Sequence, residues 1–145
     1  MFYQINQSQY PPQLTDPMEA ELTDNGFVGL KSPEAVETLL EKEEGTVLLV
    51  VNSVCGCAAR NARPAAVIAT RDGKLPDALV TVFAGVDGGA VQKARDYMLP
   101  YPASSPSMAL FKDGKLVHFI ERHNIEGRDA AAIAKNLKMA FEAYC

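Results

Sequence analysis

The chain has 145 residues, of which 48% are hydrophobic and 22% charged, and its formal net charge is −4. This length fits one unit that buries its own core, so we expect a single domain over residues 1–145. The mildly acidic balance argues against nucleic-acid or anionic-membrane partners, which usually meet a basic surface. No apolar run reaches the length of a membrane span, and the polar N-terminus resembles neither a signal peptide nor an anchor.

Before the first strand, the sequence predicts an irregular segment and two helices. Residues 1–13 lack a regular pattern and are expected to form an irregular lead-in. The first helix is predicted over residues 14–25, because apolar side chains recur there at a spacing of four. The second begins at Ser32, a cap residue followed by proline at the first helical position, and ends at Gly45. The apolar residues of the first helix are Leu14, Met18 and Leu22.

From residue 46 onward, apolar strands alternate with helices. Residues 46–53 form a continuous apolar run without alternation, which is typical of a strand covered on both faces. A helix is predicted to follow from Cys55 to about Thr70, kinked but not ended by Pro64. A second buried strand is predicted over 79–85 and a further helix over 88–99.

A hairpin and a final helix complete the predicted fold. Asp113 and Gly114 separate the apolar stretches "SMALFK" and "KLVHFIE", and this pair favours the positive φ angles of a two-residue turn. The last helix is expected over 127–144, with Ile133, Leu137 and Phe141 along one apolar stripe. The order β-α-β-α-β-β-α, with two extra N-terminal helices, predicts an α/β three-layer sandwich whose closing hairpin is antiparallel.

The cysteines are few, and two of them are close together. Cys55 and Cys57 are separated by one residue, whereas Cys145 ends the chain. An odd number of cysteines that includes a tight pair is typical of a reducing compartment, so we expect a cytoplasmic protein. In such proteins, paired cysteines are usually redox-active or bind metal.

Cys55 is predicted to lie where a strand ends and a helix begins. Unpaired backbone N–H groups and the helix dipole stabilise a thiolate there, and a thiolate attacks disulfides. Gly56 removes side-chain bulk beside the sulfur. A disulfide between Cys55 and Cys57 closes a very small ring, so we expect it to be strained and easily reduced. This pattern predicts thiol–disulfide exchange, with Cys55 attacking and Cys57 resolving or assisting.

Two other interpretations of the cysteine pair remain open. The cysteines can be small buried apolar residues without redox chemistry. They can also bind a metal or a cluster, but this needs three or four ligands. Cys145, His118 and His123 are the available additional ligands, and no second ligand pair has the usual spacing, so we expect no metal site.

Residues 46–57 and 106–120 carry a resemblance to thioredoxin. The stretch "PSMALFKDGKLVHFI" is similar to the part of thioredoxin in which a cis-proline precedes a strand, a turn and the next strand. "TVLLVVNSVCGC" lies where the thioredoxin strand runs into its active site. The pair Cys-Gly-Cys is not that of thioredoxin, the chain contains no tryptophan, and Leu49 stands where thioredoxin buries an aspartate. Efficient dithiol reduction of the thioredoxin kind is therefore not expected.

The longer stretches "VVNSVCGCAA", "SSPSMALFKDGKLVHFIERH" and "FEAYC" resemble the bacilliredoxin family, whose members are small thioredoxin-like bacterial proteins. The resemblance covers nearly the whole chain from Met18. It implies an enzyme that reduces mixed disulfides between client proteins and bacillithiol, an anionic small thiol used as co-substrate, with no other cofactor. Cys55 would take up bacillithiol, and Cys57 or another thiol would release it. A general disulfide isomerase or oxidoreductase is the alternative, and the protein can be a monomer or a homodimer.

Several residues are expected to support the cysteines. The resemblance implies that Pro106 is cis and that Ser105 and Pro106 present backbone groups to a substrate. Asn52 and Ser53 are expected to hydrogen-bond the loop or cap the helix, with capping preferred and contact with the substrate as the second interpretation. Cys145 is a bystander or a third redox partner.

Charged residues near the motif have more ordinary predicted roles. Arg60 and Arg63 lie one turn apart, and we expect them on a solvated helix face, where either can attract an anionic thiol. His118 is predicted to be a half-buried strand residue, and His123 to have a structural role.

Overall fold

The computed structural model describes residues 8–42 and 44–145. Its centre is a mixed five-stranded sheet with the order β1-β3-β2-β4-β5. The first three strands in this order run parallel, whereas β4 and β5 are antiparallel to their neighbours. The strands are β1 (Val28–Gly29), β2 (Thr46–Asn52), β3 (Ala78–Phe83), β4 (Ser107–Lys112) and β5 (Lys115–Ile120).

The central strand β2 explains the continuous apolar run of the sequence. All seven of its residues are buried, because helices cover both faces of the sheet. It pairs with β3 on one side and with β4 on the other. Since β2 ends at Asn52, the segment that follows leaves the sheet at its carboxyl edge, between two neighbouring strands.

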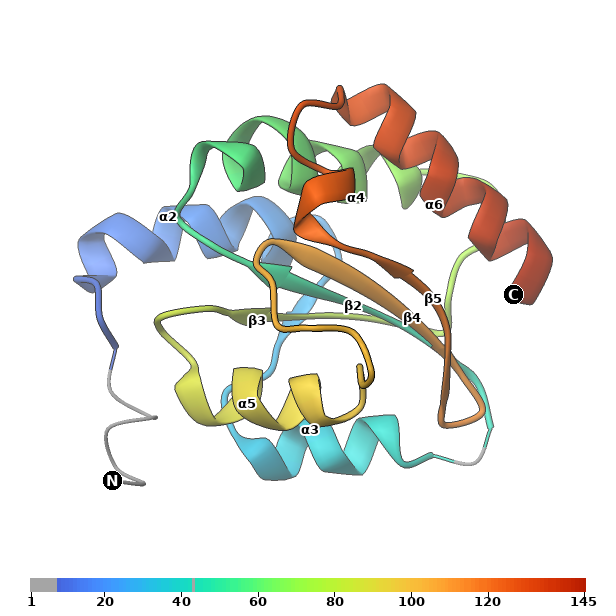
Figure 1. Ribbon diagram of the computed structural model, residues 1–145, viewed down its shortest axis with the longest axis horizontal. Helices are drawn as coiled ribbons and strands as arrows, with labels where there is room; N and C mark the ends of the chain where they lie inside the picture. The colour runs from blue at the N-terminus through green and yellow to red at the C-terminus, as the bar shows by residue number, and fades with distance from the viewer. Residues whose placement is uncertain (1–7, 43) are drawn as a thin grey trace.

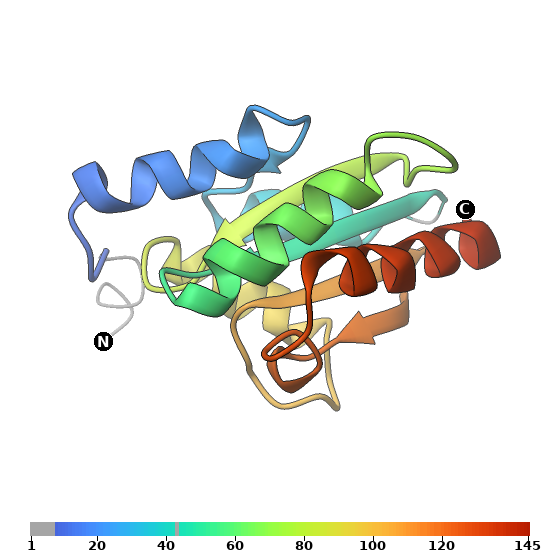
Figure 2. The same ribbon diagram turned by 90° about the horizontal axis from the view of Figure 1, so that it is seen from above.

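The helices form two layers, which confirms the predicted three-layer α/β sandwich. One face of the sheet is covered by α2, α4 and α6, and the other by α3 and α5 (Figures 1 and 2). Two separate apolar clusters lie between these layers and the sheet. The helices are α2 (Pro12–Thr23), α3 (Pro33–Leu40), α4 (Arg63–Ala69), α5 (Gly88–Asp96) and α6 (Ala130–Tyr144), with the shorter η1 (Ala58–Ala62) and η2 (Arg122–Asn124).

Local sequence signals set the ends of several elements. Asp113 and Gly114 have φ angles of 52° and 80°, which confirms the predicted turn between β4 and β5. Ser32 accepts a hydrogen bond from the backbone N–H of Ala35 and so caps α3. Asp129 caps α6 by accepting from the backbone N–H of Ala132.

The helical segment after the cysteines begins with an irregular turn. The π-helical η1 ends at Ala62, and α4 continues from Arg63 without a break. Pro64 has no N–H to donate to the carbonyl of Arg60, and a π turn is one way in which a helix accommodates such an interruption. The prediction that Pro64 distorts but does not end the helix is therefore confirmed.

The N-terminal part differs from the prediction in several details, one of which is that α3 ends at Leu40 and not at Gly45. The helix α2 begins at Pro12, inside the expected lead-in, whose residues 1–7 lie outside the described part of the chain. Leu14 is 42% exposed, and Thr15 is buried in its place. The two-residue strand β1, which the sequence did not predict, pairs with β3 at the edge of the sheet. It is too short for an alternating pattern.

Within the described residues, no helix combines the length and the apolar character that crossing a membrane requires.

Candidate active site

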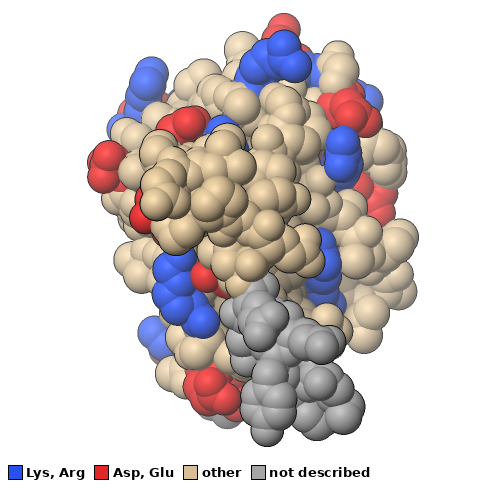
Figure 3. Space-filling view, turned by 90° about the vertical axis from the view of Figure 1, so that its left-hand side faces the viewer, with Lys and Arg blue, Asp and Glu red and all other residues tan. Residues whose placement is uncertain are grey.

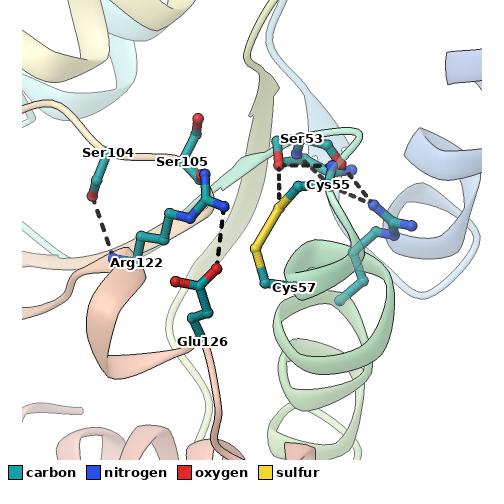
Figure 4. The surroundings of a disulfide bond; sticks show 9 residues. Ser53, Cys55, Cys57, Ser104, Ser105, Arg122 and Glu126 are labelled. Carbon is teal, nitrogen blue, oxygen red and sulfur yellow. Dashed lines mark hydrogen bonds and ion pairs between the residues drawn. A yellow bond between two sulfur atoms is a disulfide. The ribbon is translucent and has the colours of Figure 1, made fainter.

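Cys55 and Cys57 lie just beyond the carboxyl end of β2 and are joined as a disulfide, with their Cα atoms 5.4 Å apart (Figure 4). The carbonyl of Cys55 accepts hydrogen bonds from the backbone N–H groups of Ala58 and Ala59, so Cys55 begins the helical segment as predicted. Cys55 is half-buried, whereas Cys57 is only 8% exposed. Of the two sulfur-bearing residues, Cys55 is thus the more accessible to an incoming disulfide.

Ser53 and Asn52 hold the loop that carries Cys55. The hydroxyl of Ser53 donates to the Cys55 Sγ at 3.3 Å and lies 3.4 Å from the Cys55 backbone N–H, which donates to it. The side-chain oxygen of Asn52 accepts from the Ser53 N–H at 2.9 Å, and its Nδ2 donates to the carbonyl of Met18 in α2. These side chains therefore hydrogen-bond the loop rather than cap the helix.

Arg63 does not lie on a solvated helix face, so that prediction was wrong. The residue is only 2% exposed. Its Nη1 donates to the Asn52 side chain at 3.0 Å and to the Ser53 carbonyl at 2.9 Å. Its Nε donates to Glu21 of α2 at 2.9 Å. Arg63 points inward because the loop before the cysteines and α2 together supply acceptors for its guanidinium.

Gly56 is exposed between the two cysteines, and Arg60 lies against it. A Cβ atom added at Gly56 would lie 2.7 Å from the Arg60 Nη2. Arg60 is exposed, as predicted, but its guanidinium folds back towards the cysteine pair rather than away from it. The absence of a side chain at Gly56 thus leaves room for a cation beside the disulfide.

The loop before β4 faces the disulfide from the neighbouring strand. Ser107 pairs with Val51 of β2, so the residues before it lie at the same edge of the sheet as Cys55. The Ser105–Pro106 peptide bond is cis, as the resemblance to thioredoxin implied. Figure 4 shows Ser104 and Ser105 across from Cys55 and Cys57. The structure thus brings together the cysteine pair and the expected substrate-binding residues.

Arg122 is a further residue of this site, and the sequence analysis assigned it no role. Its Nη1 donates to the Ser105 carbonyl at 3.3 Å, and its backbone N–H donates to the Ser104 hydroxyl. Its Nη2 pairs with Glu126 at 3.3 Å, and the side chains of Arg122 and Glu126 are 44% and 58% exposed. Arg122 follows β5, and only the pairing of β5 with β4 brings it to the proline loop.

The two histidines lie in ordinary environments. His118 is half-buried in β5, as predicted, and its Nε2 lies 2.7 Å from the Asn136 side chain. His123 is 72% exposed and pairs with Glu121. Within residues 8–42 and 44–145, no group of three or more His, Cys, Asp and Glu side chains is arranged to hold a metal ion.

Cys145 lies at the other end of the sheet. It lies near Thr46, the first residue of β2, whereas Cys55 follows the last residue of that strand. The structure therefore does not bring Cys145 to the cysteine pair. Loss of solvent around the sulfur raises the pKa of the Cys145 thiol, and the nearby Asp77 carboxylate adds to the effect.

The raised thiol pKa of Cys145 predicts slow alkylation. In the oxidised protein Cys145 is the free cysteine, and less of it is thiolate at a given pH than in an unstructured peptide. We expect iodoacetamide to modify it more slowly at pH 8 than it modifies a peptide that ends in Glu-Ala-Tyr-Cys, with the difference lost in urea. Intact mass over time measures both rates. Equal rates in the folded protein and the peptide would contradict the assigned environment.

Comparisons with known proteins agree with this geometry. A family model described as disulphide isomerase matches residues 10–145. A bacilliredoxin of Cytophaga hutchinsonii is 59% identical over 133 residues, which cover 92% of this chain and 98% of the relative. A bacilliredoxin of Halalkalibacterium halodurans is 52% identical, with 97% of this chain and 98% of the relative covered.

Solved structures show the same fold at low sequence identity. Oxidised thioredoxin O2 of Arabidopsis thaliana matches with a TM-score of 0.56 and 20% identity, over 81% of this chain and 96% of that structure. The thioredoxin of Aeropyrum pernix matches with a TM-score of 0.55 and 20% identity, over 78% of this chain and 84% of that structure. The chain therefore belongs to the disulphide isomerase family, together with its bacilliredoxin relatives, and is a thioredoxin-fold thiol–disulfide oxidoreductase.

Proposed function

We propose that this oxidoreductase removes bacillithiol from client proteins by reducing the mixed disulfide between them, in a reducing cytoplasm. The observation that carries the proposal is the placement of a half-buried Cys55, bonded to Cys57, opposite a cis-proline loop held by Arg122. The names of the bacilliredoxin relatives support the choice of thiol.

The reaction begins with the reduced cysteine pair. Cys55 loses its proton to water, and its thiolate attacks the bacillithiol sulfur of the mixed disulfide. The bond between that sulfur and the client breaks, the client leaves as a thiolate that takes up a proton, and bacillithiol is now bound to Cys55. The Cys57 thiolate then attacks the Cys55 sulfur and releases bacillithiol as a thiolate, which leaves the Cys55–Cys57 disulfide. Two electrons from a thiol reductant return the pair to the reduced state.

The surroundings of the disulfide fit an anionic small thiol. Arg60 lies over Gly56 on one side, and Arg122 lies beside Ser105 on the other. Both guanidinium groups belong to exposed residues, so each can exchange its present contacts for a carboxylate of the substrate. The end of the molecule towards which β2 and β3 run also has a broad area without charged side chains (Figure 3), over which a client protein can approach.

Arg122 provides a test of this substrate class. In Arg122→Met, we expect kcat/KM for a bacillithiol-modified client to fall about tenfold, because a charge-assisted hydrogen bond to the anionic adduct is lost. The matched control is the same client modified with 2-mercaptoethanol, a neutral small thiol, for which the variant should keep the wild-type value. Release of the free client thiol measures both rates. An equal loss for the two substrates would show that Arg122 does not recognise the anion.

Disulfide isomerisation is the second candidate, and the description of the matching family favours it. In that case Cys55 would form a mixed disulfide with the client itself, and Cys57 would release clients that fail to rearrange. Recovery of activity from scrambled ribonuclease, compared with removal of bacillithiol at the same enzyme concentration, distinguishes the two functions. The proposal requires bacillithiol removal to be the faster process.

A further inference from the structure

A cation lies buried directly behind the loop that carries Cys55. Arg63 is one of the largest fully buried side chains of the protein, at 2% exposure. Three acceptors surround its guanidinium: the Asn52 side chain, the Ser53 carbonyl and the Glu21 carboxylate. An arginine keeps its charge under all conditions in which a protein folds. Its burial therefore places a permanent positive charge against residues 52 and 53.

The negative partner of Arg63 compensates this charge incompletely. The side chain of Glu21 is 49% exposed, whereas that of Arg63 is 2% exposed. Water screens the field of an exposed charge more strongly than that of a buried one. Because the loop lies on the buried side of this pair, it experiences a net positive field.

Other charged groups around the cysteines are paired or exposed. From the helical segment Arg60 lies at Gly56, and from the β5 side Arg122 is paired with Glu126. At the end of β3, Asp87 is paired with Lys31.

Ser53 connects Arg63 to the reacting sulfur. The Ser53 carbonyl accepts from Arg63, and the Ser53 hydroxyl donates to the Cys55 Sγ at 3.3 Å. A hydroxyl donor stabilises a thiolate more strongly than a thiol or a disulfide sulfur, because the acceptor then carries a full charge. In the disulfide form this donor already lies beside the Cys55 sulfur, where it can stabilise the thiolate that reduction produces.

We propose that Arg63 is a positioning residue for the oxidoreductase reaction, which stabilises the Cys55 thiolate through its buried charge and through its hold on Ser53. The step that it favours is the ionisation of reduced Cys55, in which the proton passes to water and the electron pair stays on sulfur. This role concerns the enzyme's own thiol and does not depend on which small thiol the enzyme removes.

The test measures the alkylation of Cys55 as a function of pH. Reduced protein with the background substitution Cys57→Ser is treated with iodoacetamide, and peptide mapping follows Cys55 and Cys145 separately. In Arg63→Met we expect the midpoint of the Cys55 rate profile to rise by about one pH unit. Arg63→Lys keeps the charge but not the planar fork, so its midpoint should lie between those of the wild type and Arg63→Met.

Glu21→Gln tests the direction in which the Cys55 midpoint shifts when a negative charge is removed. This variant keeps a hydrogen-bond acceptor for Arg63 but removes the opposing charge, so the Cys55 midpoint should fall by a few tenths of a pH unit. Cys145 in the same samples is the internal control, because it lies at the other end of the sheet, and its profile should not move. Glu21 is half exposed, so the substitution is tolerable even if Arg63→Met does not fold.

A purely structural role for Arg63 predicts a different pattern. Folded Arg63→Met with an unchanged Cys55 midpoint, or Glu21→Gln with an unchanged or raised midpoint, would overturn the proposal. Because iodoacetamide replaces the biological substrate, none of these results depends on bacillithiol, and a failure here is distinct from a failure of the proposed function.

Discussion

In Cys55→Ala, we expect the rate of bacillithiol transfer from a client to fall on the order of a thousandfold or more, because the attacking sulfur is removed. Cys57 cannot replace it, since Cys57 is only 8% exposed and lies buried in the first turn of the helical segment. The hydroxyl of Ser53 also contacts Cys55 and would be left without its acceptor. Release of free client thiol in a single turnover, with the enzyme in excess, measures the loss.

Cys145→Ala is the matched control for this result. It removes a cysteine too, but one that lies near Thr46 at the start of β2. The variant is expected to keep the wild-type rate. If Cys145→Ala lost activity while Cys55→Ala kept it, the assignment of the reactive cysteine would be wrong.

The second large effect concerns the middle of the sheet. Leu49 is completely buried in β2, between Val80 of β3 and Ala109 of β4. Leu49→Asp places a carboxyl group there without a partner, and we expect the free energy of unfolding to fall by about 4 kcal/mol at pH 7. Since domains of this size are stable by roughly 5–15 kcal/mol, the variant should approach unfolding. Urea denaturation followed by circular dichroism measures the change.

The destabilisation caused by Leu49→Asp is expected to depend on pH in a defined direction. Burial raises the pKa of a carboxyl group in the folded state above its unfolded value of about 4. The variant is therefore least destabilised at a pH below the unfolded-state pKa. Its loss of unfolding free energy relative to the wild type grows as the pH rises towards the folded-state pKa. Leu49→Met, which keeps the volume and adds no charge, should cost about 1 kcal/mol at every pH. A deficit of Leu49→Asp that is independent of pH would contradict the buried environment.

The parts of the fold that depend on local sequence were predicted well. The apolar run that became β2 has no alternation because the strand is covered on both faces, and this information is contained in seven consecutive residues. The turn at Asp113 and Gly114 depends on two residues whose φ angles are positive. The stripe of Ile133, Leu137 and Phe141 is buried in α6, as its helical spacing requires.

The parts that depend on distant contacts were not predicted. The acceptors of Arg63 come from α2 and from the end of β2 and the loop after it. Arg63 and Glu21, for example, are 42 residues apart in the sequence. The π-helical turn before Arg63 also changes the direction in which the following side chains point. A prediction based on the period of a regular helix does not account for this change. An arginine in an alanine-rich helix is more often solvated, so no local signal distinguished this one.

Arg122 and Cys145 illustrate the same limit at the site. Arg122 reaches the proline loop only through the pairing of β5 with β4, and Ser105 is 17 residues away in the sequence. Cys145 shares its residue type with the disulfide-bonded pair, but the direction of α6 carries it to the opposite end of the sheet (Figure 1). Residue type predicted the chemistry of Cys55, whereas position in the fold separates Cys55 from Cys145.

The most direct test of the proposed function is the mass of what Cys55 retains. Cys57→Ala, reduced and mixed with a bacillithiol-modified client, lacks the thiol that would release the captured group. Intact-mass analysis should show the variant heavier by one bacillithiol and the client as a free thiol. A disulfide-linked complex of the variant with the client itself would instead indicate isomerase chemistry. The absence of any adduct would contradict attack by Cys55 on this class of mixed disulfide.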